Sequence, residues 1–278
     1  MPAISSPDDE QLHAELEAVF GKGKGRKYAR VLLAVLSSLP WVGGFFSGAV
    51  ALSSESEQGK VNELFRRWME EHQEQAKRLS LALLDVFTRL DGLGEQIQER
   101  IESDDYLQLG RKAFRTWDAA DTDEKRRLIQ NLIANAGATK LCSDDIVRLF
   151  INWINYYHEI HFRVIREIYR QPGITRGGIW AIFYGASVRE DSAEADLFSL
   201  LIRDLSTGGV IRQHRETTYD GQFVKKSAAR SRSSSHVAKS RFDDNEPYEL
   251  TQLGRQFVHY TMNEIVPRVA GGTQEQPV

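Results

Sequence analysis

Apolar residues recur at intervals of three and four positions over much of the chain, which is the spacing of one helical face. The longest such run follows Ser53-Ser54-Glu55 and reaches Ile101, with charged residues on the other faces. It predicts a long amphipathic helix, with Gly92 and Gly94 as candidate interruptions. Shorter periodic segments predict partner helices at about 105–117, 121–136 and 143–170. We expect these helices to form a bundle within one chain, with a homo-oligomer through the long helix as the alternative.

One stretch, residues 31–52, carries no charged side chain. Pro40-Trp41-Val42-Gly43-Gly44 lies in its middle and predicts two helical pieces, each of about ten residues and too short to cross a bilayer. Three interpretations stay open: a transmembrane helix, an apolar hairpin that contacts a membrane or a partner, and two helices buried in a core. The candidate contacts with an anionic membrane surface or a partner are Lys22, Lys24, Arg26, Lys27, Leu39, Trp41, Phe45 and Phe46.

Later in the chain the elements become shorter, and their start and stop signals become clear. Gln171-Pro172-Gly173 ends one helix, and Thr175 precedes a second. A third helix is predicted at about 192–207, with Asp191 as its N-cap and Gly208-Gly209 as its stop.

A β-hairpin is expected after the third helix. Val210-Ile211-Arg212 and Tyr248-Glu249-Leu250 have the composition of strands, Asp220-Gly221 that of a turn, and Thr251 opens a last helix. Three helices, a hairpin and a closing helix in this order are typical of a winged-helix domain. The predicted fold class is therefore mainly α, with an N-terminal helical bundle that holds the long amphipathic helix and the apolar hairpin, followed by a winged-helix domain with a small β-hairpin.

The expected domain organisation has four parts. They are an N-terminal helix and basic linker at 1–27, a helical domain at 28–142, a winged-helix-like domain at 143–268 and a disordered tail at 269–278.

The segment between the two predicted strands is basic and rich in serine, and residues 223–242 contain no acidic residue. Such a segment would contact a nucleic-acid backbone without reading its sequence, whereas the alternative is a solvated loop insertion. Its candidate nucleic-acid-binding residues are Lys225, Lys226, Arg230, Arg232, Lys239 and Arg241.

The start of the third helix has the opposite charge. Winged helices often place this part of the third helix in the major groove of DNA. Here it carries Glu190, Asp191, Glu194 and Asp196, and their carboxylates would oppose the approach of phosphates. We therefore expect the third helix to contact a protein partner instead of DNA bases.

Composition and motifs favour a protein without an enzymatic reaction or a cofactor. The net charge of −3 gives no bulk attraction to nucleic acid or lipid, so such contacts depend on local clusters. Cys142 is the single cysteine, which excludes an internal disulfide and a zinc site built from several thiolates. His158 and His161 have a spacing that metal ligation allows, but they lie beside aromatic residues and predict a packed face. No phosphate loop, nucleophile elbow or dinucleotide fingerprint occurs.

The predicted location is the cytoplasm, with a peripheral site at the inner membrane as an option. Residues 1–20 hold several carboxylates and lack the basic leading region of a signal peptide.

A family resemblance enters at residues 122–136, Thr-Asp-Glu-Lys-Arg-Arg-Leu-Ile-Gln-Asn-Leu-Ile-Ala-Asn-Ala, followed by Phe150-Ile151 and Ile165. This part resembles the helical region of the abortive-infection alpha family of bacterial proteins. The resemblance implies a role in defence against phage, and it transfers no catalytic residue.

Two function classes follow from these patterns. The first is an interaction or effector protein in which the winged helix controls an apolar hairpin. The second is a regulator that binds the nucleic-acid backbone through the basic loop, with the helical domain supplying self-association.

Overall fold

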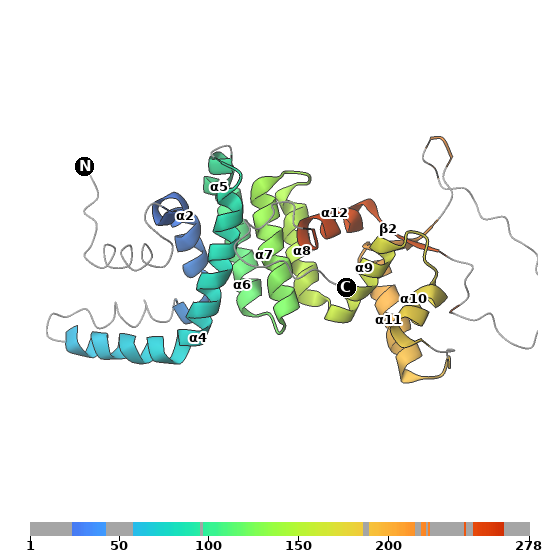
Figure 1. The fold of residues 1–278 in the computed structure, drawn as a ribbon, viewed down its shortest axis with the longest axis horizontal. Helices are drawn as coiled ribbons and strands as arrows, with labels where there is room; N and C mark the ends of the chain where they lie inside the picture. The colour runs from blue at the N-terminus through green and yellow to red at the C-terminus, as the bar shows by residue number, and fades with distance from the viewer. Residues whose placement is uncertain are drawn as a thin grey trace, which may run out of the picture. The chain divides into compact units, whose positions relative to one another are not determined.

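The computed structural model describes residues 24–42, 58–94, 97–185, 189–214, 218–220, 222, 242 and 247–263, with side chains from residue 28 in the first range and from residue 72 in the second. The chain is mainly helical and contains a small antiparallel sheet of two strands (Figure 1). It divides into two compact units. Unit 1 comprises Met1–Tyr156 and Tyr260–Val278, and unit 2 comprises Tyr157–His259. The division therefore falls later than the boundary expected after Cys142.

Unit 1 is built from helices that start at capped positions. Ser103 accepts a hydrogen bond from the Tyr106 amide, and Thr122 accepts one from the Lys125 amide. Helix α6 packs against α2, α7 and α8, and α4 packs against α7 (Figure 1). The helices are α2 (Lys24–Leu36), α4 (Gln58–Asp91), α5 (Gln98–Glu102), α6 (Asp104–Asp118), α7 (Asp123–Ala138) and α8 (Asp144–Tyr156).

The uncharged stretch is broken before Pro40, three residues earlier than its helix-breaking residues suggested. Helix α2 ends at Leu36, and the Ser38 hydroxyl donates to the Val35 carbonyl oxygen in the turn that follows. Helical backbone resumes at Pro40, because proline suits the first turn of a helix, where its missing amide costs nothing. The interpretation of residues 31–52 as one transmembrane helix is therefore wrong. Residues 43–52 lie outside the described residues.

The first half of this stretch is packed inside unit 1. Its buried residues are Val31, Leu32, Ala34, Val35, Leu39 and Val42. Among the described residues, the interpretation as a buried core segment is the one that agrees with the structure. No described helix is long and apolar enough to cross a membrane.

The long amphipathic helix is α4, and its apolar face is buried from Leu79 to Leu90. It ends where the glycines were expected to interrupt it, since Gly94 adopts a φ of 75°, which favours glycine. By contrast, the single helix expected at 143–170 is two helices, α8 and α9 (Glu159–Arg170). The backbone leaves the helical conformation at His158, whose amide donates to Nδ1 of His161 at 3.1 Å and so caps α9.

A polar group lies inside the apolar core of unit 1. Arg89 of α4 is 1% exposed, and its guanidinium donates to Oδ1 of Asn131 at 2.8 Å and to Oδ1 of Asn135 at 3.4 Å. The Asn131 amide donates to the Thr261 carbonyl oxygen at 2.9 Å. The Asn135 amide donates to the carbonyl oxygens of Tyr260 and Asn263, each at 2.9 Å. We call these residues the Arg89 network.

Unit 2 contains α9, α10 (Arg176–Tyr184), α11 (Ala193–Thr207), β1 (Ile211–Gln213), β2 (Tyr248–Leu250) and the greater part of α12 (Gln252–Thr261). The two strands are antiparallel, and Arg212 lies opposite Glu249. On its other edge β2 meets the segment before α10, because Gly173 donates to the Tyr248 carbonyl oxygen and Tyr248 donates to that of Ile174. Strand β2 therefore has backbone partners along both edges.

The predicted starts and stops in unit 2 are nearly all confirmed. The hydroxyl of Thr175 caps α10, and Gly209 adopts a φ of 74° after α11. The N-cap of α11 is Ser192 and not Asp191 as predicted, because the Ser192 hydroxyl accepts from the Ala195 amide. The Asp191 carboxylate instead pairs with the Arg189 guanidinium at 2.6 and 3.0 Å.

Candidate functional site

Three arginines of unit 2 line one hollow of about 550 Å³. Arg176 is the first residue of α10, Arg203 lies in the second half of α11, and Arg212 lies in β1. The short strand, the capped helix start and the helix end bring these cations together from positions far apart in the sequence. We call this site the arginine hollow. Its remaining lining residues are Ile202, Ser206, Thr207, Ile211, Gln213 and Tyr248.

The floor of the arginine hollow is fixed by the Tyr248 hydroxyl. Arg176 donates to this oxygen at 2.9 Å, and Gln213 donates to it at 3.5 Å. The Arg176 guanidinium also lies 5.8 Å from the centre of the Tyr248 ring, within the range of a cation–π contact. Because Tyr248 is buried, its hydroxyl and ring fix the position of the Arg176 side chain in the lining of the hollow.

Arg212 is held by a carboxylate on the neighbouring strand. Its Nε donates to Oε1 of Glu249 at 2.7 Å, while His214 Nδ1 lies 3.1 Å from Oε2. Burial alone would raise the pKa of the Glu249 carboxyl, but the hydrogen bonds from His214 and Arg212 outweigh it and lower that pKa. Glu249 is therefore ionised at neutral pH and orients Arg212 across the strand pair.

Arg203 differs from the other two arginines because its guanidinium has no hydrogen bond or ion pair in the part of the chain that the structure describes. The side chain is exposed, and no acidic residue is among the described residues that line the hollow. Guanidinium groups bind phosphate with paired hydrogen bonds, so the arrangement suits a phosphate group. Sequence analysis missed these arginines, since their single positions carry no local pattern.

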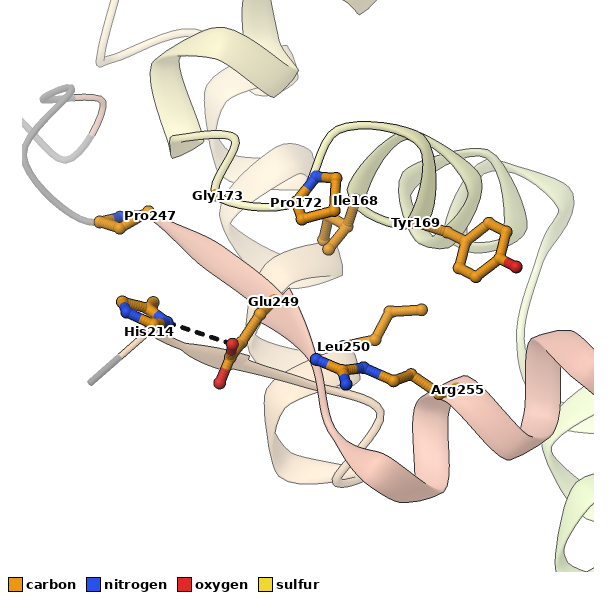
Figure 2. Close-up of a pocket in the computed structure, with 9 residues that line it drawn as sticks. All are labelled: Ile168, Tyr169, Pro172, Gly173, His214, Pro247, Glu249, Leu250 and Arg255. Carbon is orange, nitrogen blue, oxygen red and sulfur yellow. Dashed lines mark hydrogen bonds and ion pairs between the residues drawn. The ribbon is translucent and has the colours of Figure 1, made fainter. Parts of the chain in front are cut away.

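A second hollow, of about 440 Å³, lies on unit 2 between the end of α9 and the start of α12. Figure 2 shows Ile168 and Pro172 on one side and Glu249, Leu250 and Arg255 on the other. His214 and Pro247 lie at one end, and Tyr169 lies at the opposite end (Figure 2). We call this site the Tyr169 groove. Its complete lining is Ile168, Tyr169, Pro172, Gly173, His214, Pro247, Glu249, Leu250 and Arg255.

The exposed side of α11 is partly apolar. Leu197 and Leu200 are 44% and 39% exposed and lie one turn apart. Glu194 and Asp196 precede them, and both are exposed. An apolar pair beside carboxylates is a poor surface for DNA and a suitable one for protein, and contact of the third helix with a protein partner stays a prediction.

The six candidate residues of the basic segment, Lys225, Lys226, Arg230, Arg232, Lys239 and Arg241, lie outside the described residues. Phe242, which follows Arg241 directly, is described and buried. Its ring lies 5.0 Å from that of Trp180 on α10 and 5.8 Å from that of Phe198 on α11, measured between ring centres. The end of the basic segment is therefore anchored on the same two helices that carry Arg176 and Arg203.

The structure describes the side chains of two candidate membrane or partner contacts, Leu39 and Trp41. Leu39 is 1% exposed, and the Trp41 indole donates to Oδ1 of Asp118 at 3.1 Å and stacks on His72. Both side chains thus take part in the packing of unit 1, with Leu39 buried and Trp41 partly exposed. Lys24, Arg26 and Lys27 lie on α2 without described side chains, and Lys22, Phe45 and Phe46 lie outside the described residues.

The two histidines that could have suggested a metal site have a structural role. His161 is buried, stacks on Tyr157 at 5.0 Å and caps α9. Burial lowers the pKa of His161, although the nearby Asp204 carboxylate acts in the opposite direction. Within the described ranges, no group of three or more His, Cys, Asp or Glu side chains could hold a metal ion.

Comparison of the chain with protein-family models, with curated proteins and with solved structures gave no match. The resemblance to the abortive-infection alpha family stays a prediction, and the functional argument depends on the geometry of unit 2.

Proposed function

We propose that unit 2 is a winged-helix domain that binds the phosphate backbone of nucleic acid without reading its sequence. The order of α9, α10, α11, the β1–β2 pair and α12 supports the winged-helix assignment. The additional backbone hydrogen bonds between β2 and residues 173–174 support it as well, because they add a third strand-like segment to the small sheet.

The observation that carries the proposal is the convergence of Arg176, Arg203 and Arg212 on one hollow whose described lining holds no acidic residue. Arg212 is paired with Glu249, which lies outside this lining, so Arg203 is the guanidinium that has no partner among the described residues. Each phosphate that an arginine neutralises releases counterions from the nucleic acid, and this release supplies most of the affinity of non-specific binding. The hydroxyls of Ser206 and Thr207 offer further polar contacts at the rim.

The basic segment adds to this charge. It joins β1 to β2, whose residues line the hollow, and Phe242 anchors its end on α10 and α11. The six cations lie outside the described residues, between β1 and Phe242 in the sequence. We infer that the segment wraps the backbone of a nucleic acid whose phosphates occupy the hollow.

The test is fluorescence anisotropy of the full chain with short labelled duplexes of unrelated sequence, measured over a range of salt concentrations. We expect similar affinities for all sequences. The logarithm of the association constant should fall linearly with the logarithm of the salt concentration. Changing Arg203 to Ala removes one phosphate contact and should flatten this slope by about 0.9. Arg255→Ala is the matched control, because Arg255 is also exposed in unit 2 but lines the other groove.

Absence of binding at low salt would contradict the proposal. So would a preference for one sequence that is lost when α11 is altered, since that result would indicate ordinary reading of the DNA groove.

A second candidate function is a protein contact through α11, and it is favoured by the exposed pair Leu197 and Leu200. In this alternative the chain is a non-enzymatic interaction protein, and a second copy of the chain is the first partner to test. Sedimentation of the wild type and of Leu197→Ser/Leu200→Ser over a range of concentrations would test it. We expect the wild type to associate and the variant to stay monomeric, and a wild type that is monomeric throughout would exclude this partner.

A further inference from the structure

The Tyr169 groove has a different chemistry from the arginine hollow, although both touch the same pair of strands. Its long sides are largely apolar, with Ile168 and Pro172 from the end of α9 facing Leu250 of β2, and Pro247 at one end (Figure 2). A volume of about 440 Å³ lies within the usual range for small-molecule sites.

Arg255 is a cation of this groove that has no partner among the described residues. The guanidinium of Arg255 has no hydrogen bond or ion pair among the residues that the structure describes, and the side chain is exposed. In Figure 2 it extends from α12 alongside Leu250. A cation next to apolar side chains attracts an anionic group that is attached to an apolar body.

The carboxylate of Glu249 does not cancel this attraction. Oε1 of Glu249 accepts from Arg212 at 2.7 Å, and Oε2 lies 3.1 Å from His214 Nδ1. Both oxygens are thus engaged by residues of the neighbouring strand or its end. Because its negative charge is compensated there, the Arg255 guanidinium remains the charge that an incoming ligand meets.

Tyr169 completes the site at the end opposite His214. Its side chain is 46% exposed, which is high for an aromatic ring at the edge of a cavity. An exposed tyrosine ring offers a flat apolar face for stacking. A ligand with an aromatic body could lie against this ring while its anionic group meets Arg255.

We propose that the Tyr169 groove binds a small organic acid that has an aromatic or otherwise apolar body and one carboxylate or sulfonate group. The apolar body lies between Ile168, Pro172 and Leu250, and the acid group pairs with Arg255. This inference does not depend on nucleic-acid binding, because none of the arginines of the hollow lines the groove.

The test uses naphthoate as the probe and naphthalenemethanol as its uncharged counterpart, with binding followed by protein NMR and calorimetry on the full chain. For a compound of this size we expect a Kd of about 1 mM for naphthoate, with shifts in the amide signals of Tyr169, Leu250 and Arg255. Loss of the charge-assisted contact in Arg255→Ala should weaken naphthoate binding about tenfold. The same change should leave binding of the alcohol unaltered.

Two further variants separate the contributions. Tyr169→Ala should weaken binding of both compounds without unfolding the domain, because the side chain is exposed, and a thermal scan checks the fold. Arg203→Ala should leave naphthoate binding unchanged while it weakens oligonucleotide binding. If oligonucleotides fail to bind but naphthoate binds as expected, the proposed function is wrong and the groove assignment stands.

If no binding is detected at a naphthoate concentration ten times the expected Kd, the assignment is overturned. Binding that is equal in the wild type, Arg255→Ala and Tyr169→Ala would also overturn it, because the compound would then occupy another part of the molecule.

Discussion

The guanidinium of Arg89, which is 1% exposed, donates a hydrogen bond to the side-chain oxygen of Asn131 at 2.8 Å. Asn131 in turn donates to the Thr261 carbonyl oxygen, so a buried charge is linked to the last turn of α12 through one amide. The asparagines therefore belong to the packing of unit 1. Their spacing of four residues places both on one face of α7.

Arg89→Ala should lower the free energy of unfolding of unit 1 by about 3–5 kcal/mol. Removing one member of a buried charged network leaves its polar partners without their hydrogen bonds. Arg111→Ala is the control, because Arg111 is an exposed residue of α6 and its loss should change stability by less than about 0.5 kcal/mol. Urea denaturation of both variants measures the difference. Equal stabilities would show that the Arg89 network does not hold the unit together.

Two glycine-to-alanine changes should have opposite effects. A Cβ at Gly254 would lie 2.1 Å from the Val210 carbonyl oxygen, which is a backbone clash, so Gly254→Ala should destabilise unit 2 by at least about 2 kcal/mol.

A Cβ at Gly110 would lie 3.9 Å from Val35 Cγ2, an ordinary contact, so Gly110→Ala in α6 should stabilise unit 1 by about 0.5–1 kcal/mol. Thermal melting shows whether each change raises or lowers stability. A Gly254→Ala variant as stable as the wild type would refute the close approach of α12 to Val210.

The pair formed by Arg100 and Asp144 should make unit 1 less stable in acid. Arg100 donates to both carboxylate oxygens at 2.9 and 2.5 Å, and these bonds lower the pKa of Asp144. A lowered folded-state pKa gives stability that is complete above the unfolded value of about 4 and is lost as the pH falls through the folded value.

Asp144→Asn should therefore cost about 2 kcal/mol at pH 7, and its difference from the wild type should shrink as the pH falls below about 4. Urea denaturation along a pH series measures this change. Asp145→Asn, at a neighbouring position whose side chain is 87% exposed, should behave like the wild type at every pH. A cost for Asp144→Asn that does not depend on pH would rule out the charged pair as its source.

The carboxylates at the start of α11 should weaken nucleic-acid binding only at low salt. Glu194 and Arg203 are nine residues apart, which is about 13 Å along a helix and exceeds the Debye length of about 8 Å at physiological ionic strength. We expect Glu194→Gln/Asp196→Asn to raise affinity about two- to threefold in dilute buffer and not at physiological salt. A large gain at both salt concentrations would place the nucleic acid on the start of α11.

The basic segment should contribute more than the hollow to the salt dependence. Changing Lys225, Lys226, Arg230 and Arg232 to Ala removes four cations and should flatten the slope of log affinity against log salt by up to about 3.6. The melting temperature should not change if the side chains make no contribution to a core. An unchanged slope would restrict binding to the arginine hollow.

The folded chain should not float with anionic liposomes, since Val31, Leu32, Val35 and Leu39 are buried in unit 1. If the wild type floats, the contact is made by the basic flank, by residues 43–52, which lie outside the described residues, or by the uncharged stretch after it leaves this packing. Changing Lys22, Lys24, Arg26 and Lys27 to Ala should then reduce flotation, because each cation near such a surface contributes about 1 kcal/mol.

Elements with strong local signals could be predicted from the sequence. Thr175 and Gly209 mark helix ends through a hydroxyl cap and a left-handed backbone, and both signals depend on single residues. The break at His158 was missed because it interrupts a continuous apolar pattern and depends on a side-chain cap from His161. Ser192 replaced Asp191 as the cap of α11 because Arg189 engages the neighbouring carboxylate.

The candidate site was beyond prediction for a different reason. Arg176, Arg203 and Arg212 lie in three elements, and the packing of α11 against β1, together with the hydrogen bond from Arg176 to Tyr248, brings them to one hollow. Tyr248 was predicted as a strand residue. The hydrogen bond from Arg176 to its hydroxyl could not be predicted, because it depends on the folded positions of α10 and β2. A sequence pattern records spacing along the chain, and it does not record such convergence.

Unit 2 occupies residues 157–259, between two parts of the chain that belong to unit 1. On a translating ribosome, Asn131 and Asn135 are therefore made before the Tyr260, Thr261 and Asn263 carbonyls that they hold. Synthesis of the residues between Asn135 and Tyr260 takes roughly 6 to 25 s at about 5–20 residues per second. Unit 1 therefore begins first, but its Arg89 network can be completed only after the last residue of unit 2 has been made.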